Sequence, residues 1–173
     1  MDKLFDVLLV VLPSLVVFLT TYYILKKFFD NENRKNVINS KVETRKQVLP
    51  VRLQAYERIA LYLERINTNS LVMRVHKKGM SARLLQSELL KAVRDEYEHN
   101  IAQQIYVSPT TWQAVKSAKE ETIKIINIAA TKVNDDASGL EFSKVLIEMA
   151  ASLDKSPTDF GMEYLKKEIK TLF

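Results

Sequence analysis

Residues 7–25 read VLLVVLPSLVVFLTTYYIL, a run of 19 residues that contains no charged side chain. A helix rises about 1.5 Å per residue, so this run would be roughly 28 Å long, close to the thickness of the hydrocarbon core of a bilayer. The run therefore predicts a single transmembrane helix. The residues expected to anchor the chain in the membrane are Val7, Leu8, Leu12, Pro13, Val17, Phe18, Tyr22, Tyr23 and Leu25.

Aromatic and basic residues follow the apolar run. Tyr22 and Tyr23 stand at its end, where amphipathic rings prefer the headgroup level. Only one basic residue, Lys3, precedes the run, whereas Lys26, Lys27, Arg34 and Lys35 come soon after it. Because cytoplasmic flanks carry the excess of Lys and Arg, the N-terminus is expected outside and the C-terminal body in the cytoplasm.

A cleaved signal peptide and a buried core helix are the two other interpretations of the run. A signal peptide has a shorter apolar segment and small residues at its cleavage site, whereas bulky side chains occupy residues 22–25. A buried core helix is typically shorter than this run. A membrane span is therefore favoured over both.

The composition of residues 26–173 predicts an all-α body. The whole chain contains only 3 Gly and 4 Pro, and helix-forming residues such as Ala, Leu, Ile, Glu, Lys and Gln dominate it. Cysteine is absent, which excludes disulfides, zinc-thiolate sites and thiol nucleophiles. We expect an N-terminal transmembrane anchor at residues 1–25, a basic juxtamembrane stalk or tether at 26–49, and a cytoplasmic bundle of about five helices at 50–173.

Apolar residues recur at steps of three and four after Pro50, which indicates amphipathic helices. Pro50 itself is expected to end the stalk, since proline disfavours helix in the residue before it. Serines precede four of the predicted helices in the N-cap position. The predicted helices cover residues 51–66, 81–104, 108–133 and 138–152, with a last one that starts at Ser156. The buried face of the last helix is expected to contain Phe160, Tyr164, Leu165, Ile169 and Leu172.

Residues 67–80 interrupt the helical pattern. Asn67, Asn69 and Ser70 favour turns, so a loop is predicted here, with a short extended piece at residues 71–75. Basic residues gather at the end of this loop around Gly79. They suggest a contact with phosphate or a lipid headgroup, although a solvated loop is the simpler interpretation because no Gly-rich phosphate cradle accompanies them.

Positive charge is concentrated in the half of the chain that follows the apolar run. Residues 26–94 contain 16 Lys or Arg against 6 Asp or Glu, whereas residues 95–173 contain 9 against 13. An anionic membrane surface would attract the basic half, by about 1 kcal/mol per nearby Lys or Arg. Nucleic acid is not favoured as a partner because no nucleic-acid-binding motif is present. The residues expected to contact an anionic surface are Lys26, Lys27, Arg34, Lys35, Arg74, Lys77, Lys78 and Arg83.

No motif for catalysis or cofactor binding is found. The chain lacks a Gly-rich phosphate loop, GxSxG, HExxH and any thiol, so an enzyme is not expected, nor is a cofactor. Glu96 and His99 have the spacing of one half of a carboxylate-bridged di-iron site. The other histidine, His76, has no Glu three residues before it, so no metal site is expected. His99 is instead expected to face a carbonyl or a carboxylate at a helix end.

Three segments carry a resemblance to a known family. They are LPVRLQAYERIALYLERI (49–66), MSARLLQSELLKAVRDEYEHNIAQQIYVS (80–108) and TWQAVKSAKEETIKIIN (111–127). Together with the position of the apolar run, they resemble a family of small, uncharacterised, N-terminally membrane-anchored helical proteins from Bacteroidetes-type bacteria. The resemblance extends over residues 49–130. It implies a bacterial inner membrane and supplies no catalytic residues.

These features favour a non-catalytic interaction or scaffold protein, an accessory subunit of an inner-membrane complex. Its expected partners are the membrane, other protein subunits of that complex and anionic lipid, and no small-molecule substrate is identified. One alternative is a peripheral binder of anionic lipid or nucleic acid that uses the basic half of the chain. The other alternative is a self-associating structural stalk.

Overall fold

The computed structural model describes residues 2–134 and 136–171, with side chains at 12–35, 43, 46–134 and 136–171. Within these residues the chain forms six α-helices and one 3₁₀ helix, and it divides into two compact units, Met1–Leu49 and Pro50–Phe173. The all-α prediction is confirmed, but the expected count of about five helices after the anchor is wrong. The elements are α1 (Asp2–Ile66), α2 (Thr68–Val75), α3 (Ala82–Asn100), η1 (Ile101–Ile105), α4 (Pro109–Ala130), α5 (Gly139–Ala151) and α6 (Pro157–Lys170).

Helix α1 continues through Pro50, so the break expected at this residue is wrong and residues 26–49 are helical. A proline in a helix removes one N–H donor and leaves the carbonyl four residues earlier without its usual partner. Here that carbonyl belongs to Lys46, and both Lys46 and Pro50 are exposed. Water can therefore bond to the freed carbonyl, which lowers the cost of the proline.

The expected loop at residues 67–80 is wrong over most of its length, because Thr68–Val75 forms α2. The Asn67 side chain accepts a hydrogen bond from the backbone N–H of Asn69 at 3.1 Å and caps the new helix. Asn67 therefore starts a helix instead of a loop. The connection that follows contains Gly79, whose φ of 88° lies in the region that favours glycine.

The four predicted serine caps are all confirmed. The side chains of Ser81, Ser108, Ser138 and Ser156 accept hydrogen bonds from the backbone N–H three residues later and start α3, α4, α5 and α6. The starts of α3 and α5 also bond to each other. The N–H of Ala82 donates to the Ala137 carbonyl at 2.9 Å, and the N–H of Gly139 donates to the Met80 carbonyl at 2.7 Å.

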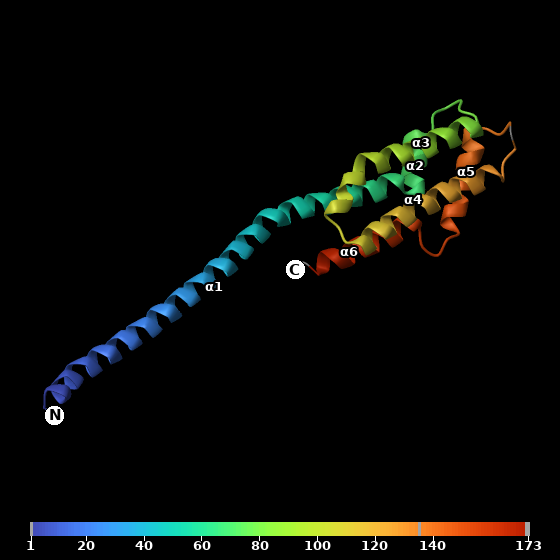
Figure 1. Ribbon diagram of the computed structural model, residues 1–173. Coiled ribbons are helices and arrows are strands. Elements are labelled where there is room, and N and C mark those ends of the chain that lie inside the picture. The colour runs from blue at the N-terminus through green and yellow to red at the C-terminus, as the bar shows by residue number, and fades with distance from the viewer. Residues whose placement is uncertain (1, 135, 172–173) are drawn as a thin grey trace. The chain divides into compact units, whose positions relative to one another are not determined.

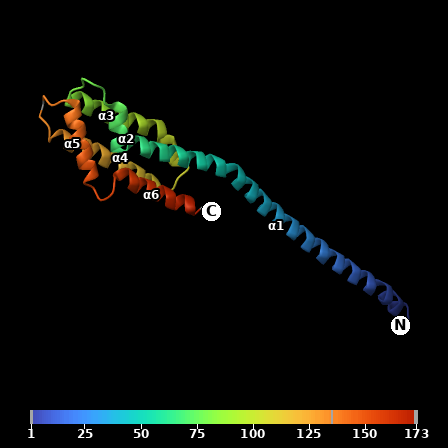
Figure 2. The ribbon, with the colours of Figure 1, turned by 180° about the vertical axis from the view of Figure 1, so that it is seen from behind.

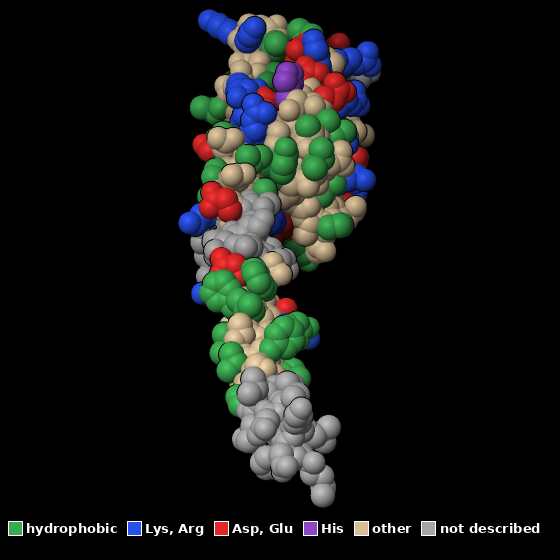
Figure 3. Space-filling model, turned by 60° about the vertical axis from the view of Figure 1, so that its left-hand side comes forward, with side chains coloured by type: hydrophobic (Ala, Val, Ile, Leu, Met, Phe, Trp, Pro, Cys, Tyr) green, Lys and Arg blue, Asp and Glu red, His purple; other side chains and the backbone are tan. Residues whose placement is uncertain are grey.

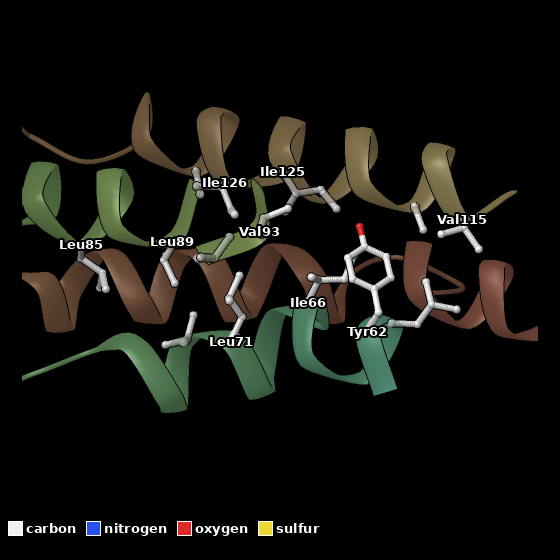
Figure 4. Close-up of a cluster of buried hydrophobic side chains, with 14 of the residues drawn as sticks. Tyr62, Ile66, Leu71, Leu85, Leu89, Val93, Val115, Ile125 and Ile126 are labelled. Carbon is white, nitrogen blue, oxygen red and sulfur yellow. The ribbon is translucent and has the colours of Figure 1, made fainter. Parts of the chain in front are cut away.

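Helix α4 is central to the unit Pro50–Phe173. It runs antiparallel to α3 and packs against both α3 and α6, while α5 packs against α2, α3 and α4 (Figures 1 and 2). Figure 4 shows apolar side chains from α2, α3, α4 and the C-terminal end of α1 meeting in one cluster. The core residues labelled there are Tyr62, Ile66, Leu71, Leu85, Leu89, Val93, Val115, Ile125 and Ile126.

The buried face of α6 differs from the prediction. Phe160 is 43% exposed, whereas Thr158, Gly161 and Leu165 are buried. Gly161 explains the difference, because a Cβ at this position would lie 3.0 Å from Cδ2 of Leu63. Its bare backbone lets α6 approach α1 closely, and the helix turns so that Phe160 packs beside Tyr164 at the surface. Leu172, the last residue of the predicted face, lies outside the described residues.

Candidate functional site

The first unit exposes apolar side chains along α1. Leu12–Lys35 is the one segment of the described residues that is long and apolar enough to cross a membrane. Within this segment the exposed fraction of the large hydrophobic side chains ranges from 49% at Val16 to 67% at Phe18. In Figure 3 green side chains project on both sides of this segment, between two stretches drawn in grey. Of the predicted anchors, Leu12, Pro13, Val17, Phe18, Tyr22, Tyr23 and Leu25 lie in the segment, and the side chains of Val7 and Leu8 are not among those described.

The predicted anion-contacting residues fall into two groups. Lys26, Lys27, Arg34 and Lys35 are exposed on α1 within the unit Met1–Leu49. The unit Pro50–Phe173 contains the other four, Arg74 in α2, Lys77 and Lys78 in the following turn, and Arg83 in α3. Arg74 is engaged within the protein, as described next.

Glu96 of α3 joins two arginines from other helices. Its Oε1 atom lies 2.6 Å from Nη2 of Arg65 and 3.2 Å from Nη1 of Arg74. The Arg74 guanidinium also donates to the Arg65 carbonyl at 3.1 Å. The Glu96 side chain is only 16% exposed, so these contacts are partly shielded from water. They connect the end of α1 to α2 and α3.

A hollow of about 460 Å³ opens beside this cluster, between α1 and α3. We call it the cationic hollow, because two arginines and one glutamate line it. Within the described part of the chain, Arg58 pairs with no carboxylate. Leu61 lies between the two arginines in sequence and is 55% exposed. The lining residues are Arg58, Leu61, Tyr62 and Arg65 from α1 and Glu96, His99 and Asn100 from α3.

His99 is fixed at the edge of the cationic hollow. Its Nδ1 atom lies 2.8 Å from the Asp95 carbonyl, which can only accept, so Nδ1 carries the proton. The prediction that His99 faces a carbonyl at a helix end is confirmed. Among the described residues no group of three or more His, Asp or Glu could hold a metal ion, and Glu96 is already paired with arginines.

A second polar cluster centres on Glu168 of α6. Its carboxylate accepts hydrogen bonds from the Tyr56 hydroxyl at 2.9 Å and from the Ser108 hydroxyl at 2.7 Å, and it pairs with Arg52 at 3.3 Å. Burial opposes ionisation, but hydrogen bonds from Thr111, Ser108 and Tyr56 outweigh it and hold the pKa of Glu168 below its ordinary value. Because its acceptors are already occupied, this cluster stabilises the fold instead of offering a site for a ligand.

The sequence predicted Arg74 as an anion-contacting residue, but it did not predict the cationic hollow. By sequence alone, Arg58 and Arg65 lie outside the apolar stripe of residues 51–66, and a solvated face with weak ion pairs is the simplest interpretation of them. Their spacing around Leu61 does place all three side chains on one exposed face of a helix. However, the sequence holds no signal that the C-terminal end of α3 would lie opposite that face, because this depends on how the helices pack.

The fold and these features define an all-helical protein with an apolar helical segment long enough to span a membrane and a compact helical unit that has its own core. The chain belongs to the family described as a family of unknown function (DUF7935), whose model matches residues 2–172. This agrees with the resemblance to an uncharacterised family. No curated protein and no solved structure matches the chain.

Proposed function

We propose that the protein is a membrane-anchored, non-catalytic interaction or scaffold protein, an accessory subunit of a bacterial inner-membrane complex. One observation carries the proposal. The exposed apolar segment Leu12–Lys35 and a unit with its own core, Pro50–Phe173, belong to the same chain. Apolar surface costs about 25 cal/mol per Å² in water, so a segment with this exposure is stabilised by lipid. A bilayer would hold the segment and leave the compact unit free to bind other proteins.

The basic residues after the apolar segment support an orientation. Lys26, Lys27, Arg34 and Lys35 are all exposed on α1. Such an excess of basic residues is typical of the cytoplasmic side of a span, and their stems can reach the interface. The proposed arrangement therefore has the N-terminus outside and the compact unit in the cytoplasm.

The membrane part of the proposal is tested by fractionation of cells that produce the chain with a tag at its C-terminus. We expect the chain in the membrane fraction after alkaline extraction, which releases peripheral proteins. In spheroplasts the C-terminal tag should resist added protease and become sensitive only after lysis. Release at alkaline pH would contradict the anchor, and digestion in intact spheroplasts would contradict the orientation.

The interaction part is tested by purification in a mild detergent. We expect a second protein to co-purify at a fixed stoichiometry through size-exclusion chromatography, and to be lost when the compact unit is deleted. A chain that elutes alone and as a monomer would count against a scaffold. A chain that elutes alone as a defined oligomer would support the self-associating stalk instead.

The exposed basic residues at the end of the apolar segment also favour a second candidate function, the binding of anionic lipid. It is tested in nanodiscs of mixed lipid by the amount of anionic lipid that stays with the chain. Replacement of Lys26 and Lys27 by glutamine should lower this amount, and salt should lower it in the unmodified chain. Replacement of Lys116 and Lys132, two exposed lysines of the other unit, is the matched control and should have no effect.

A further inference from the structure

We propose that the cationic hollow binds a carboxylate-rich segment of a protein partner, with Arg58 and Arg65 as the residues that receive its carboxylates. The inference rests on the proposed function, because it gives the chemistry of one contact that an interaction protein would make. It concerns a site within Pro50–Phe173 and does not depend on the membrane span.

The residues that line the hollow include two arginines but only one carboxylate. Arg65 and Arg74 share one oxygen of Glu96, and Arg58 pairs with no carboxylate in the described part of the chain. A guanidinium carries several N–H donors and stays charged at any physiological pH. Glu96 uses only a few of these donors. The hollow can therefore accept further negative charge.

The existing ion pairs indicate which anion suits the hollow. Glu96 shows that a carboxylate oxygen reaches Arg65 at 2.6 Å, and charge-assisted contacts of this kind are among the stronger hydrogen bonds in proteins. Arginine is also enriched at the centres of protein–protein interfaces. A second carboxylate placed beside Glu96 would find the unused donors of Arg58 and Arg65.

Size and apolar surface favour a peptide segment over a single small ion. The hollow measures about 460 Å³, and one water molecule occupies roughly 30 Å³ in the liquid. The exposed side chain of Leu61 lines it beside the arginines and offers contact to an apolar side chain. A segment that combines acidic residues with one apolar residue therefore matches the lining.

Glu96 would compete with such a segment. It is the one carboxylate among the lining residues, and it already occupies part of Arg65 and Arg74. Replacement of Glu96 by glutamine keeps the shape of the side chain and removes its charge. This substitution should make the hollow bind an acidic peptide more tightly, whereas loss of an arginine should weaken binding.

The experiment is a calorimetric titration of the full chain in zwitterionic nanodiscs. The probe is an acetylated peptide of one leucine followed by five glutamates. We expect saturable binding at one site per chain, about fivefold weaker for Arg58→Gln and about threefold tighter for Glu96→Gln. The matched control is Arg94→Gln, because Arg94 is an exposed arginine of α3 that pairs with no carboxylate of the described residues and does not line the hollow. It should change the affinity by less than about twofold.

Three results would overturn the inference. The first is the absence of saturable binding, and the second is an equal loss of affinity in Arg58→Gln and Arg94→Gln. The third is displacement of the peptide by an equimolar concentration of inorganic phosphate, which would assign the hollow to phosphate groups. Circular dichroism of each variant confirms that it is folded. Since the titration needs neither membrane insertion nor a native partner, its failure is distinguishable from failure of the extraction and co-purification experiments.

Discussion

The Glu168 carboxylate accepts hydrogen bonds from both the hydroxyl and the backbone N–H of Ser108, a residue 60 positions earlier in the chain. The Ser108 hydroxyl lies 2.7 Å from Oε2 and the Ser108 backbone N–H lies 2.9 Å from Oε1. Ser108 is the N-cap of α4, so the last turns of α6 place a carboxylate at the positive end of the α4 dipole. The contact joins the start of one helix to the end of another.

Replacement of Glu168 by glutamine should destabilise the protein by about 2 kcal/mol at neutral pH, because hydrogen bonds to a charged, mostly buried acceptor are lost. The folded-state pKa of Glu168 is lowered from 4.5. The stability that ionised Glu168 contributes is therefore fully present above pH 4.5, and it is lost as the pH falls through the lower folded-state pKa. Urea unfolding of both chains between neutral and acidic pH should show the difference shrink only in acid.

Glu163→Gln is the control for this prediction. Glu163 is a glutamate of the same helix whose side chain is 42% exposed, and it pairs with Lys155 and Lys167, which also lower its pKa. Exposed ion pairs contribute little, so the stability should hardly change. An equal loss of unfolding free energy in the two variants would contradict the assignment of Glu168 as a buried structural acceptor.

Replacement of Tyr62 by phenylalanine should raise the stability. Tyr62 is 1% exposed, and among the described residues its hydroxyl has no hydrogen-bond partner. Figure 4 shows this hydroxyl between the side chains of Val115 and Ile125. A buried hydroxyl without a partner costs about 1–3 kcal/mol, so its removal should gain about 1 kcal/mol and raise Tm. Burial also raises the pKa of Tyr62, which fits the same apolar setting.

Tyr56→Phe is the matched substitution. The Tyr56 hydroxyl donates to Glu168 at 2.9 Å and accepts from Arg52 at 2.6 Å. Its removal should lower Tm, because a buried acceptor loses a donor. If both phenylalanine variants changed Tm in the same direction, the contrast between an unpartnered Tyr62 hydroxyl and a hydrogen-bonded Tyr56 hydroxyl would be refuted.

Gly139→Ala should destabilise the protein by about 1–3 kcal/mol, because a Cβ at this position forces a backbone shift. That Cβ would lie 2.9 Å from the Met80 carbonyl oxygen. Alanine is the better helix former, so helix propensity alone predicts the opposite sign. Thermal unfolding decides between them, and an increase in Tm would contradict the close approach of the two backbones.

Val17→Arg should impair membrane insertion. Val17 lies inside Leu12–Lys35 and is 63% exposed, and an arginine at the centre of a span costs about 3 kcal/mol on insertion scales. The fraction of chain that resists alkaline extraction should fall. Val51→Arg adds the same charge at an exposed position of the other unit and should leave the fraction unchanged.

Local signals in the sequence were sufficient for the helix starts but not for every connection. The Ser108-Pro109 and Ser156-Pro157 pairs act through atoms within one turn, so their caps were predicted correctly. Asn67 was misjudged because the same side chain favours both turns and helix caps, and the packing of Leu71 in the core decides for the helix. Phe160 was placed inside because the hydrophobic pattern gives no weight to a glycine such as Gly161.

The candidate site could be predicted only in part for the same reason. The apolar segment is continuous in sequence, and composition alone reveals it. The cationic hollow instead combines Arg58 and Arg65 with Glu96, about thirty positions later in the chain. No local pattern relates these positions, since they meet only when α3 packs against α1.

The paired bonds between the starts of α3 and α5 have a consequence for how the compact unit opens. The amides of Ala82 and Gly139 each donate to a carbonyl next to the other helix start, so neither bond can open without strain on its neighbour. In deuterium exchange these two amides should lose protection together, at one rate and with one dependence on denaturant, although 57 positions separate them in the chain.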